Sequence, residues 1–107
     1  MMKNCSLQSI LADVEIVKIV GNDEKNVVAI DTDSRNIAKD MAFVAIRGVA
    51  VDGHSFIGKA EELGASVVVC EQLPETVNPN VTYVVVKHSV IACGYMLRNF
   101  YGIDFGK

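Results

Sequence analysis

Two polar clusters in the sequence each follow a short apolar run, and they contain the side chains best suited to bind a ligand. Residues 31–35 (DTDSR) follow the run at 27–30, and residues 48–54 (GVAVDGH) follow the run at 41–46. In open α/β sheets, ligands bind beyond the carboxyl ends of the strands, where loop side chains and the free N–H groups of the next helix meet. If both runs are strands, the two clusters predict a binding site.

The residue types leave two interpretations of these clusters open. His54 and Ser55 stand at the start of a predicted helix, where unpaired N–H groups and the helix dipole favour an anion. However, Asp33 can simply accept local N–H bonds and pair with Arg35, and Asp52-Gly53 is a common turn dipeptide. A histidine beside a helix start is also commonly a cap or a surface residue.

The sequence contains none of the common catalytic motifs. A phosphate-binding loop of the form G-x-x-x-x-G-K-[ST] is absent, because Tyr101 stands where a motif ending in Gly106-Lys107 needs its first glycine. There is also no G-x-S-x-G, no H-E-x-x-H and no G-x-G-x-x-G. We therefore expect no catalytic residue in this chain.

The three cysteines do not form a recognisable metal or redox motif. Cys5, Cys70 and Cys93 are widely separated, and neither His54 nor His88 has zinc-ligand spacing from two of them. Cys70 ends a valine run and Cys93 falls on the apolar face of a predicted helix. We expect both to be buried thiols, and we expect no metal site.

The composition is that of one small globular domain. The chain has 107 residues, of which 50% are hydrophobic and 21% are charged, which is enough apolar material for one core. A net charge of -3 without a Lys/Arg-rich run argues against a nucleic-acid partner. No apolar stretch approaches the roughly 20 residues of a membrane span, so we expect no membrane association and a cytoplasmic location.

Hydrophobic periodicity predicts helices and strands in an alternating order. Three helices are expected. The first begins after Ser6, the second spans 55–63 and ends at Gly64, and the third extends from Ser89 to Tyr101-Gly102. The expected strands are 15–20, 27–30, 41–46, 65–70 and 82–86. The strand–helix–strand unit at 41–70 implies a right-handed crossover with parallel pairing. The predicted fold is a small single α/β domain with a mixed or mostly parallel sheet flanked by helices.

Four segments together resemble the N-terminal domain of the Mur ligases. They are Asp33-Ser34-Arg35, the run MAFVAIRG at 41–48, the run DGHSFI at 52–57, and Gly64-Ala65 before a valine strand. The family pattern is D-S-R, then G-D-[LM]-F-V-A-[IL]-x-G, then D-G-H-[DS]-F, and its order and spacing match over about residues 27–102. Within the family, the chain most resembles the MurE branch, which adds diaminopimelate or L-lysine, with the D-alanyl-D-alanine-adding ligase as the close alternative.

The resemblance implies that residues 1–107 form an N-terminal domain that binds the UDP part of UDP-N-acetylmuramoyl-L-alanyl-D-glutamate. The central ATP-binding domain and the C-terminal domain would then be absent from this chain. ATP and Mg²⁺ would be cofactors of the whole ligase, and this domain would have none. Alone, the domain would bind substrate and would not catalyse.

The resemblance also implies a set of substrate-binding residues. Thr32 and Ser34 would contact the nucleotide, and the segment after Gly48 would lie along the uridine. His54 could approach the diphosphate from the helix start. The full predicted set is Thr32, Ser34, Val49, Ala50, Val51, Gly53 and His54.

One departure from the family pattern concerns a turn. Lys39-Asp40 replaces the usual Gly-Asp before the 41–46 run, so this turn cannot rely on the freedom of glycine at positive φ. A function of a different class also stays open: a free-standing interaction module that kept the fold but lost the ligand.

Overall fold

The computed structural model describes residues 4–48 and 51–102, and a five-stranded sheet forms its centre. The strands are β2 (Ile16–Val20), β4 (Ile30–Asp31), β5 (Ala42–Val44), β6 (Val67–Cys70) and β7 (Thr82–Val86), in the spatial order β2-β7-β6-β5-β4. The four strands from β7 to β4 are parallel, and β2 pairs antiparallel with β7. The predicted α/β class and mostly parallel sheet are therefore confirmed.

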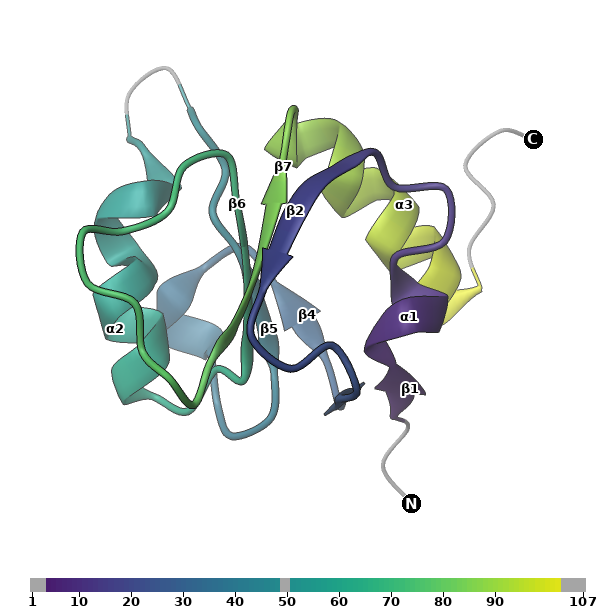
Figure 1. Ribbon diagram of the computed structural model, residues 1–107, viewed down its shortest axis with the longest axis horizontal. Coiled ribbons are helices and arrows are strands. Elements are labelled where there is room, and N and C mark those ends of the chain that lie inside the picture. Colours follow the sequence, from purple (N-terminus) through teal and green to yellow (C-terminus); the bar gives the residue numbers. More distant parts are fainter. Residues whose placement is uncertain (1–3, 49–50, 103–107) are drawn as a thin grey trace.

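Helices cover both faces of this sheet (Figure 1). On one face lies α2 (Ile57–Glu62), preceded by the 3-10 turn η2 (Gly53–Phe56); on the other lie α1 (Leu7–Ile10) and α3 (Ser89–Tyr101). A second 3-10 turn, η1 (Ser34–Asn36), follows β4. The short strands β1 (Cys5–Ser6) and β3 (Asn26–Val27) form a separate antiparallel pair. Among the described residues, no helix is long and apolar enough to cross a membrane.

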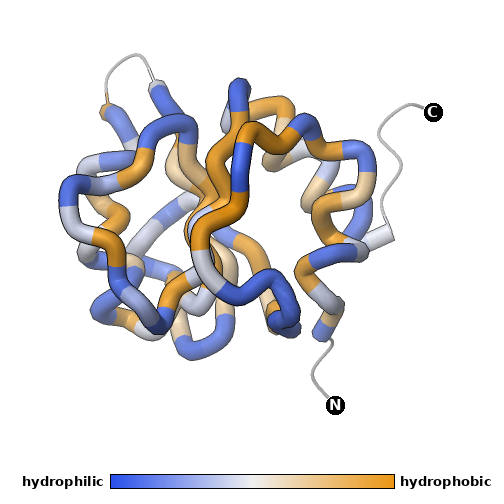
Figure 2. Tube along the Cα trace, viewed as in Figure 1, coloured by the Kyte–Doolittle hydropathy of each residue, from blue (hydrophilic) through white to orange (hydrophobic). Residues whose placement is uncertain are grey.

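Side-chain alternation along the central strands produces two hydrophobic cores. In β6, Val67 and Val69 belong to the core under α1 and α3, whereas Val68 and Cys70 belong to the core under α2. Successive side chains of a strand point to opposite faces, so a strand covered on both sides must be apolar throughout. All residues of β5, β6 and β7 are buried, and Figure 2 shows the corresponding hydrophobic colouring along the centre of the molecule.

The predicted strand–helix–strand unit is present, and so are the glycines expected to end the helices. β5 and β6 pair in parallel on either side of the chain segment that contains α2. Gly64, just after α2, has φ +111, and Gly102 ends α3 in the left-handed conformation with φ +71. A Cβ on Gly64 would lie 2.8 Å from the Lys39 Cα, so this glycine is required both by its φ and by close packing.

The prediction of one strand at 27–30 is wrong. Val27 pairs with Cys5 in the small ladder, whereas Ile30 pairs with Ala42 in the main sheet. Between them, the Val28 N–H donates to the carbonyl of Asp40, and the chain bends. An apolar run read along the sequence does not show that two of its residues pair with different partners.

The predicted starts of two helices also need correction. Ser89 does not cap α3 but is its first residue, and the N-cap residue His88 makes no side-chain capping bond. The helix expected at 55–63 begins as η2, and α2 itself starts at Ile57. Ile57 and Ala60 face the sheet, whereas Phe56 is 42% exposed.

The turn that lacks the family's glycine has its positive φ at the next residue. Asp40 has φ +65, and its N–H donates to the carbonyl of Gly64 at 3.1 Å. Aspartate tolerates the left-handed region better than most residues with a side chain, so Lys39 can replace glycine without needing a positive φ itself.

Candidate functional site

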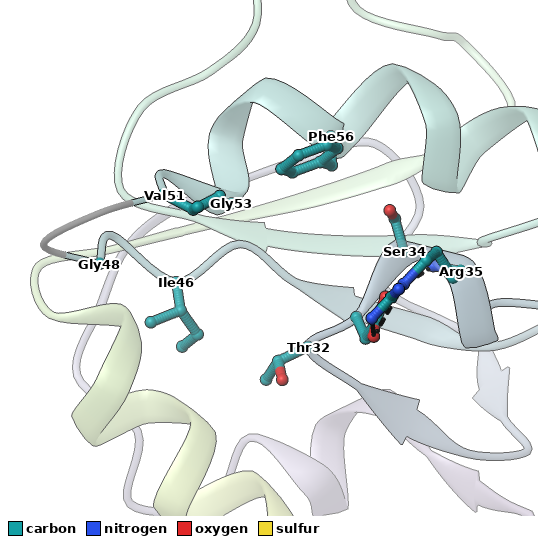
Figure 3. Close-up of a pocket in the computed structure, with 9 residues that line it drawn as sticks. Thr32, Ser34, Arg35, Ile46, Gly48, Val51, Gly53 and Phe56 are labelled. Carbon is teal, nitrogen blue, oxygen red and sulfur yellow. Dashed lines mark hydrogen bonds and ion pairs between the residues drawn. The ribbon is translucent and has the colours of Figure 1, made fainter.

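A pocket of about 550 Å³ lies beyond the carboxyl ends of β4 and β5 (Figure 3). Because these two strands are parallel neighbours, the loops that follow them meet at the same edge of the sheet. The pocket is lined by Thr32, Asp33, Ser34, Arg35, Ile46, Gly48, Val51, Gly53 and Phe56. Its volume is in the range of about 300–1,000 Å³ typical of small-molecule sites.

The loop after β4 is held by aspartate side chains that accept hydrogen bonds from the backbone ahead of them. The Asp33 N–H donates to Asp31 Oδ1 at 2.8 Å, and the Arg35 N–H donates to Asp33 Oδ1 at 2.9 Å. The Asn36 side chain donates to the other Asp31 oxygen at 3.3 Å. Such local bonds fix a tight loop without regular secondary structure, which explains the choice of aspartate at these positions.

Arg35 is paired with Asp33, as the turn interpretation predicted. Its Nη2 lies 2.7 Å from Asp33 Oδ2, and its Nε also donates to Asp33. The side-chain and backbone hydrogen bonds from Arg35 lower the pKa of Asp33 to about 2. The Arg35 side chain is 85% exposed, so its guanidinium retains N–H groups that can reach a ligand at the mouth of the pocket.

Ser34 supplies a hydroxyl within this loop. The residue is 6% exposed, and in Figure 3 its hydroxyl points toward the side of the pocket where Phe56 lies. Within the described residues, 4–48 and 51–102, this hydroxyl makes no hydrogen bond. It is therefore free to donate to, or accept from, a ligand.

The second wall of the pocket is formed by the segment after β5. The Gly53 N–H donates to the carbonyl of Ile46 at 2.7 Å, and the Gly48 N–H donates to the carbonyl of Val51 at 3.1 Å. A Cβ on Gly53 would lie 2.7 Å from the Ile46 nitrogen, which is closer than packing allows. Glycine at position 53 therefore lets the two backbones of this wall approach each other.

His54 lies beside the pocket lining, with both ring nitrogens already bonded. Its Nδ1 is 2.8 Å from Asp52 Oδ1, and its Nε2 accepts the Glu71 N–H at 2.9 Å. The Glu71 N–H can only donate, so Nε2 is unprotonated and Nδ1 carries the proton. The imidazole is held by the protein and is 14% exposed.

The structure thus brings four of the seven predicted residues to the pocket: Thr32, Ser34, Val51 and Gly53. His54 contacts the supporting loop and is not part of the lining. Val49 and Ala50 lie outside the described residues.

Sequence reasoning missed Ile46 and Phe56 as lining residues. Ile46 falls in the expected strand 41–46 and Phe56 in the expected helix 55–63, whereas the strand ends at Val44 and the α-helix starts at Ile57. Their signal in the sequence is weak: each lies two positions from an end of the predicted 48–54 cluster, which does not fix which way its side chain faces.

The described residues do not contain a group of three or more histidine, cysteine or acidic side chains that could hold a metal ion. Cys70 and Cys93 are buried and free, as predicted. Burial raises the pKa of the Cys70 thiol to about 11 and also raises the pKa of Cys93. Neither sulfur is poised to act as a thiolate nucleophile.

A mostly parallel sheet covered by helices, with a pocket of polar and apolar residues at its carboxyl edge, defines the class: an α/β ligand-binding domain. Residues 26–101 match the model of the Mur ligase family, catalytic domain. The chain belongs to the Mur ligase family.

Its relatives include several ligases named for the same reaction. The UDP-N-acetylmuramoyl-L-alanyl-D-glutamate--2,6-diaminopimelate ligase of Phocaeicola vulgatus is 41% identical over 90% of this chain and 20% of its own length. The ligases of that name from Cytophaga hutchinsonii and Clostridium tetani are 40% and 39% identical, over 89% and 90% of this chain. The chain spans about a fifth of the length of these relatives.

Solved structures show the same fold. A crystal structure of MurF from Acinetobacter baumannii superposes with a TM-score of 0.73 at 20% identity, over 92% of this chain and 21% of the other. MurF ligase from Thermotoga maritima in complex with ADP superposes with a TM-score of 0.59 at 26% identity, over 69% of this chain and 17% of the other. The predicted family is confirmed, and the named relatives favour its MurE branch.

Proposed function

We propose that this domain binds the UDP part of a UDP-N-acetylmuramoyl-peptide in the pocket between the loop after β4 and the segment after β5. The observation that carries the proposal is the combination of free polar groups and apolar surface in one pocket. Thr32 and Ser34 supply hydroxyls, and Ile46, Val51 and Phe56 supply apolar contacts. A uracil ring needs both, because its edges form hydrogen bonds while its faces are apolar.

The exposed guanidinium of Arg35 is the group we assign to the diphosphate. Its pair with Asp33 uses Nε and Nη2, and the remaining N–H groups of the fork can bond a phosphate oxygen. One placed arginine is consistent with an acidic chain that lacks a basic patch. Val49 and Ala50 of the predicted set remain part of this proposal as contacts, and His54 remains in it as a residue beside the lining.

We propose further that the domain acts within a longer ligase, as its N-terminal domain. The relatives, which are about five times longer, are named as ligases that join diaminopimelate to UDP-N-acetylmuramoyl-L-alanyl-D-glutamate. ATP and Mg²⁺ would act in the other domains, because this sequence has no phosphate-binding loop. Diaminopimelate is favoured over lysine and over the D-alanyl-D-alanine-adding reaction, since the similar relatives carry that name.

The proposal is tested by titrating the chain with UDP and following backbone amide signals by NMR. Shifts should concentrate at Thr32, Ser34, Val51 and Gly53. Ser34→Ala should weaken binding roughly two- to tenfold, the effect of losing one neutral hydrogen bond. Ser55→Ala is the matched control, because Ser55 is exposed, lies near the pocket and does not line it.

If saturating UDP moved none of these signals, nucleotide binding by this pocket would be abandoned in favour of the interaction-module alternative. Equal weakening by Ser34→Ala and Ser55→Ala would leave nucleotide binding in place but remove Ser34 from the site. UDP alone is a suitable probe because the proposal assigns only the nucleotide part of the substrate to this pocket.

A further inference from the structure

A chain of hydrogen bonds ties the second wall of the pocket to the end of β6 and the start of α3. It runs from Asp52 through the ring of His54 to the backbone of Glu71, and from the Glu71 carboxylate to Ser89. Asp52 precedes the pocket residue Gly53, Glu71 directly follows β6, and Ser89 is the first residue of α3. We call these four residues the Asp52–Ser89 chain.

In the Asp52–Ser89 chain, the link between the pocket wall and the end of β6 passes through the imidazole ring of His54. Asp52 Oδ1 accepts both the backbone N–H of His54, at 3.0 Å, and the ring Nδ1, at 2.8 Å. On its other side the ring accepts the Glu71 N–H. Among the charged groups around it, Asp52 comes from its own segment, Arg47 from the segment after β5 and Glu71 from the end of β6; α3 contributes the neutral Ser89.

We propose that His54 is a positioning residue: in its neutral form it holds the 51–56 wall against the end of β6 in the shape that binds a nucleotide. The nucleotide part of this statement rests on the proposed function, whereas the positioning part stands on the hydrogen bonds alone. A protonated ring would turn Nε2 into a donor facing the Glu71 N–H, so this link is lost when the imidazole gains its second proton.

Acid should therefore loosen the wall and weaken binding through this one ring. The carboxylates beside it stay ionised over the same interval, because hydrogen bonds from His54 lower the pKa of Asp52 and those from Ser89 lower the pKa of Glu71. The two conditions to compare are about pH 7.5 and about pH 5.5, because histidine is the side chain that ordinarily changes charge between about pH 5 and 8.

Two substitutions distinguish the hydrogen bond made by Nε2 from the one made by Nδ1. His54→Gln places an amide oxygen where Nε2 accepts, so it keeps the bond to the Glu71 N–H and does not titrate. His54→Asn places an amide nitrogen where Nδ1 donates, so it keeps Asp52 and loses Glu71. A role in filling space alone would also favour the larger glutamine, but it would not make the wild type lose Glu71 protection in acid while His54→Gln keeps it.

The experiment measures amide hydrogen exchange at Glu71 and the affinity for UDP-N-acetylglucosamine in the 107-residue chain at both pH values. This probe has no phosphate group that titrates in the interval, because both phosphates are esterified. We expect Glu71 to be protected at both pH values in His54→Gln, and in the wild type at the higher pH only. His54→Asn at either pH, and the wild type in acid, should show a lower protection factor at Glu71, meaning faster exchange relative to the intrinsic rate at the same pH. Both should also bind roughly two- to tenfold more weakly.

Equal Glu71 protection in the wild type, His54→Asn and His54→Gln at both pH values would overturn the proposal. If His54→Asn does not fold, the proposal is tested by comparing Glu71 protection in His54→Gln and in the wild type at the two pH values. If the exchange pattern is as expected but no variant binds the probe, the proposed function fails and the positioning role stands.

Discussion

At the scale of single residues, the loops of this domain are shaped by hydrogen bonds between close neighbours in sequence. Asp31 and Asp33 each accept the N–H two residues ahead, and Asp52 does the same for His54. These contacts follow from the short reach of an aspartate side chain, and the sequence predicts the one at Asp33. What they create is a pair of rigid loops on which Ser34 and Gly53 are presented to the pocket.

The first prediction concerns the close backbone approach at Gly53. Gly53→Ala should lower the free energy of unfolding by about 1–3 kcal/mol, because its methyl group would overlap the Ile46 backbone. It should also weaken UDP binding, since the wall of the pocket must move. Denaturant unfolding monitored by circular dichroism measures the first effect, and the UDP titration measures the second.

Gly58→Ala is the control for this substitution. A Cβ at Gly58 meets nothing within 4 Å, and the residue lies in α2, so alanine should raise stability by up to about 1 kcal/mol. If Gly53→Ala were as stable as the wild type and bound UDP equally well, the close approach would not constrain the pocket.

At the scale of elements, strand ends and helix starts are joined across the sheet by side chains that are distant in sequence. Glu71, at the end of β6, accepts the Ser89 N–H at 2.8 Å and the Ser89 hydroxyl at 3.0 Å, and so caps α3 from outside. A carboxylate at this position also interacts favourably with the helix dipole. Ser89 alone suggested a cap, but a fully buried serine at the first helical position needs an acceptor supplied by another element.

Glu71→Ala should therefore destabilise the domain by about 1–3 kcal/mol, because it leaves two buried donors of Ser89 without an acceptor. Glu71→Gln retains an oxygen acceptor and should cost less. Thermal unfolding measures both, with Glu62→Ala at an exposed position of α2 as the control. A loss of stability in Glu62→Ala equal to that in Glu71→Ala would contradict the capping role.

The Glu71 carboxylate also accounts for part of the acid sensitivity of the fold. The Ser89 N–H lowers the pKa of Glu71 below its ordinary value of 4.5, so the carboxylate stabilises the fold above that value. This contribution disappears as the pH falls through the lowered pKa of the folded state. In Glu71→Gln, the decline of stability below about pH 4.5 should be correspondingly shallower.

At the scale of the whole molecule, two cores on opposite faces of one sheet hold the layers together. Tyr83 lies at the centre of the core under α2 and is fully buried. Its hydroxyl donates to Glu61 of α2 and accepts the Asn78 N–H, so one phenol joins β7, α2 and the long connection before β7. A buried hydroxyl with both partners satisfied fixes how these pieces pack.

Tyr83→Phe should lower stability by about 1–2 kcal/mol, because the Asn78 N–H and the Glu61 carboxylate lose their partner. Burial, followed by the bond to Glu61, raises the pKa of Tyr83 from 10.0 to about 12. The neutral phenol therefore stabilises the fold below pH 10.0, and this contribution is lost as the pH rises toward about 12. Tyr83→Phe should remove this alkaline component.

Tyr95→Phe provides the comparison, since Tyr95 is 37% exposed and its ring lies beneath the Arg98 guanidinium. It should change the free energy of unfolding by less than about 0.5 kcal/mol. Denaturation of the three proteins across alkaline pH gives both quantities. Equal effects of the two substitutions would show that the Tyr83 hydroxyl does not link the layers.

The sequence by itself determined the α/β class, the parallel unit around α2, the glycines at the helix ends and the Asp33–Arg35 pair. These features depend on periodicity, backbone freedom and contacts over a few residues, which local residue types encode. The tertiary structure alone decided that residues 27–30 divide between β3 and β4, that Glu71 rather than Ser89 supplies the acceptor at α3, and that Ile46 and Phe56 line the pocket. Each of these depends on which segments, distant in sequence, lie side by side, because pairing and burial are properties of the packed sheet.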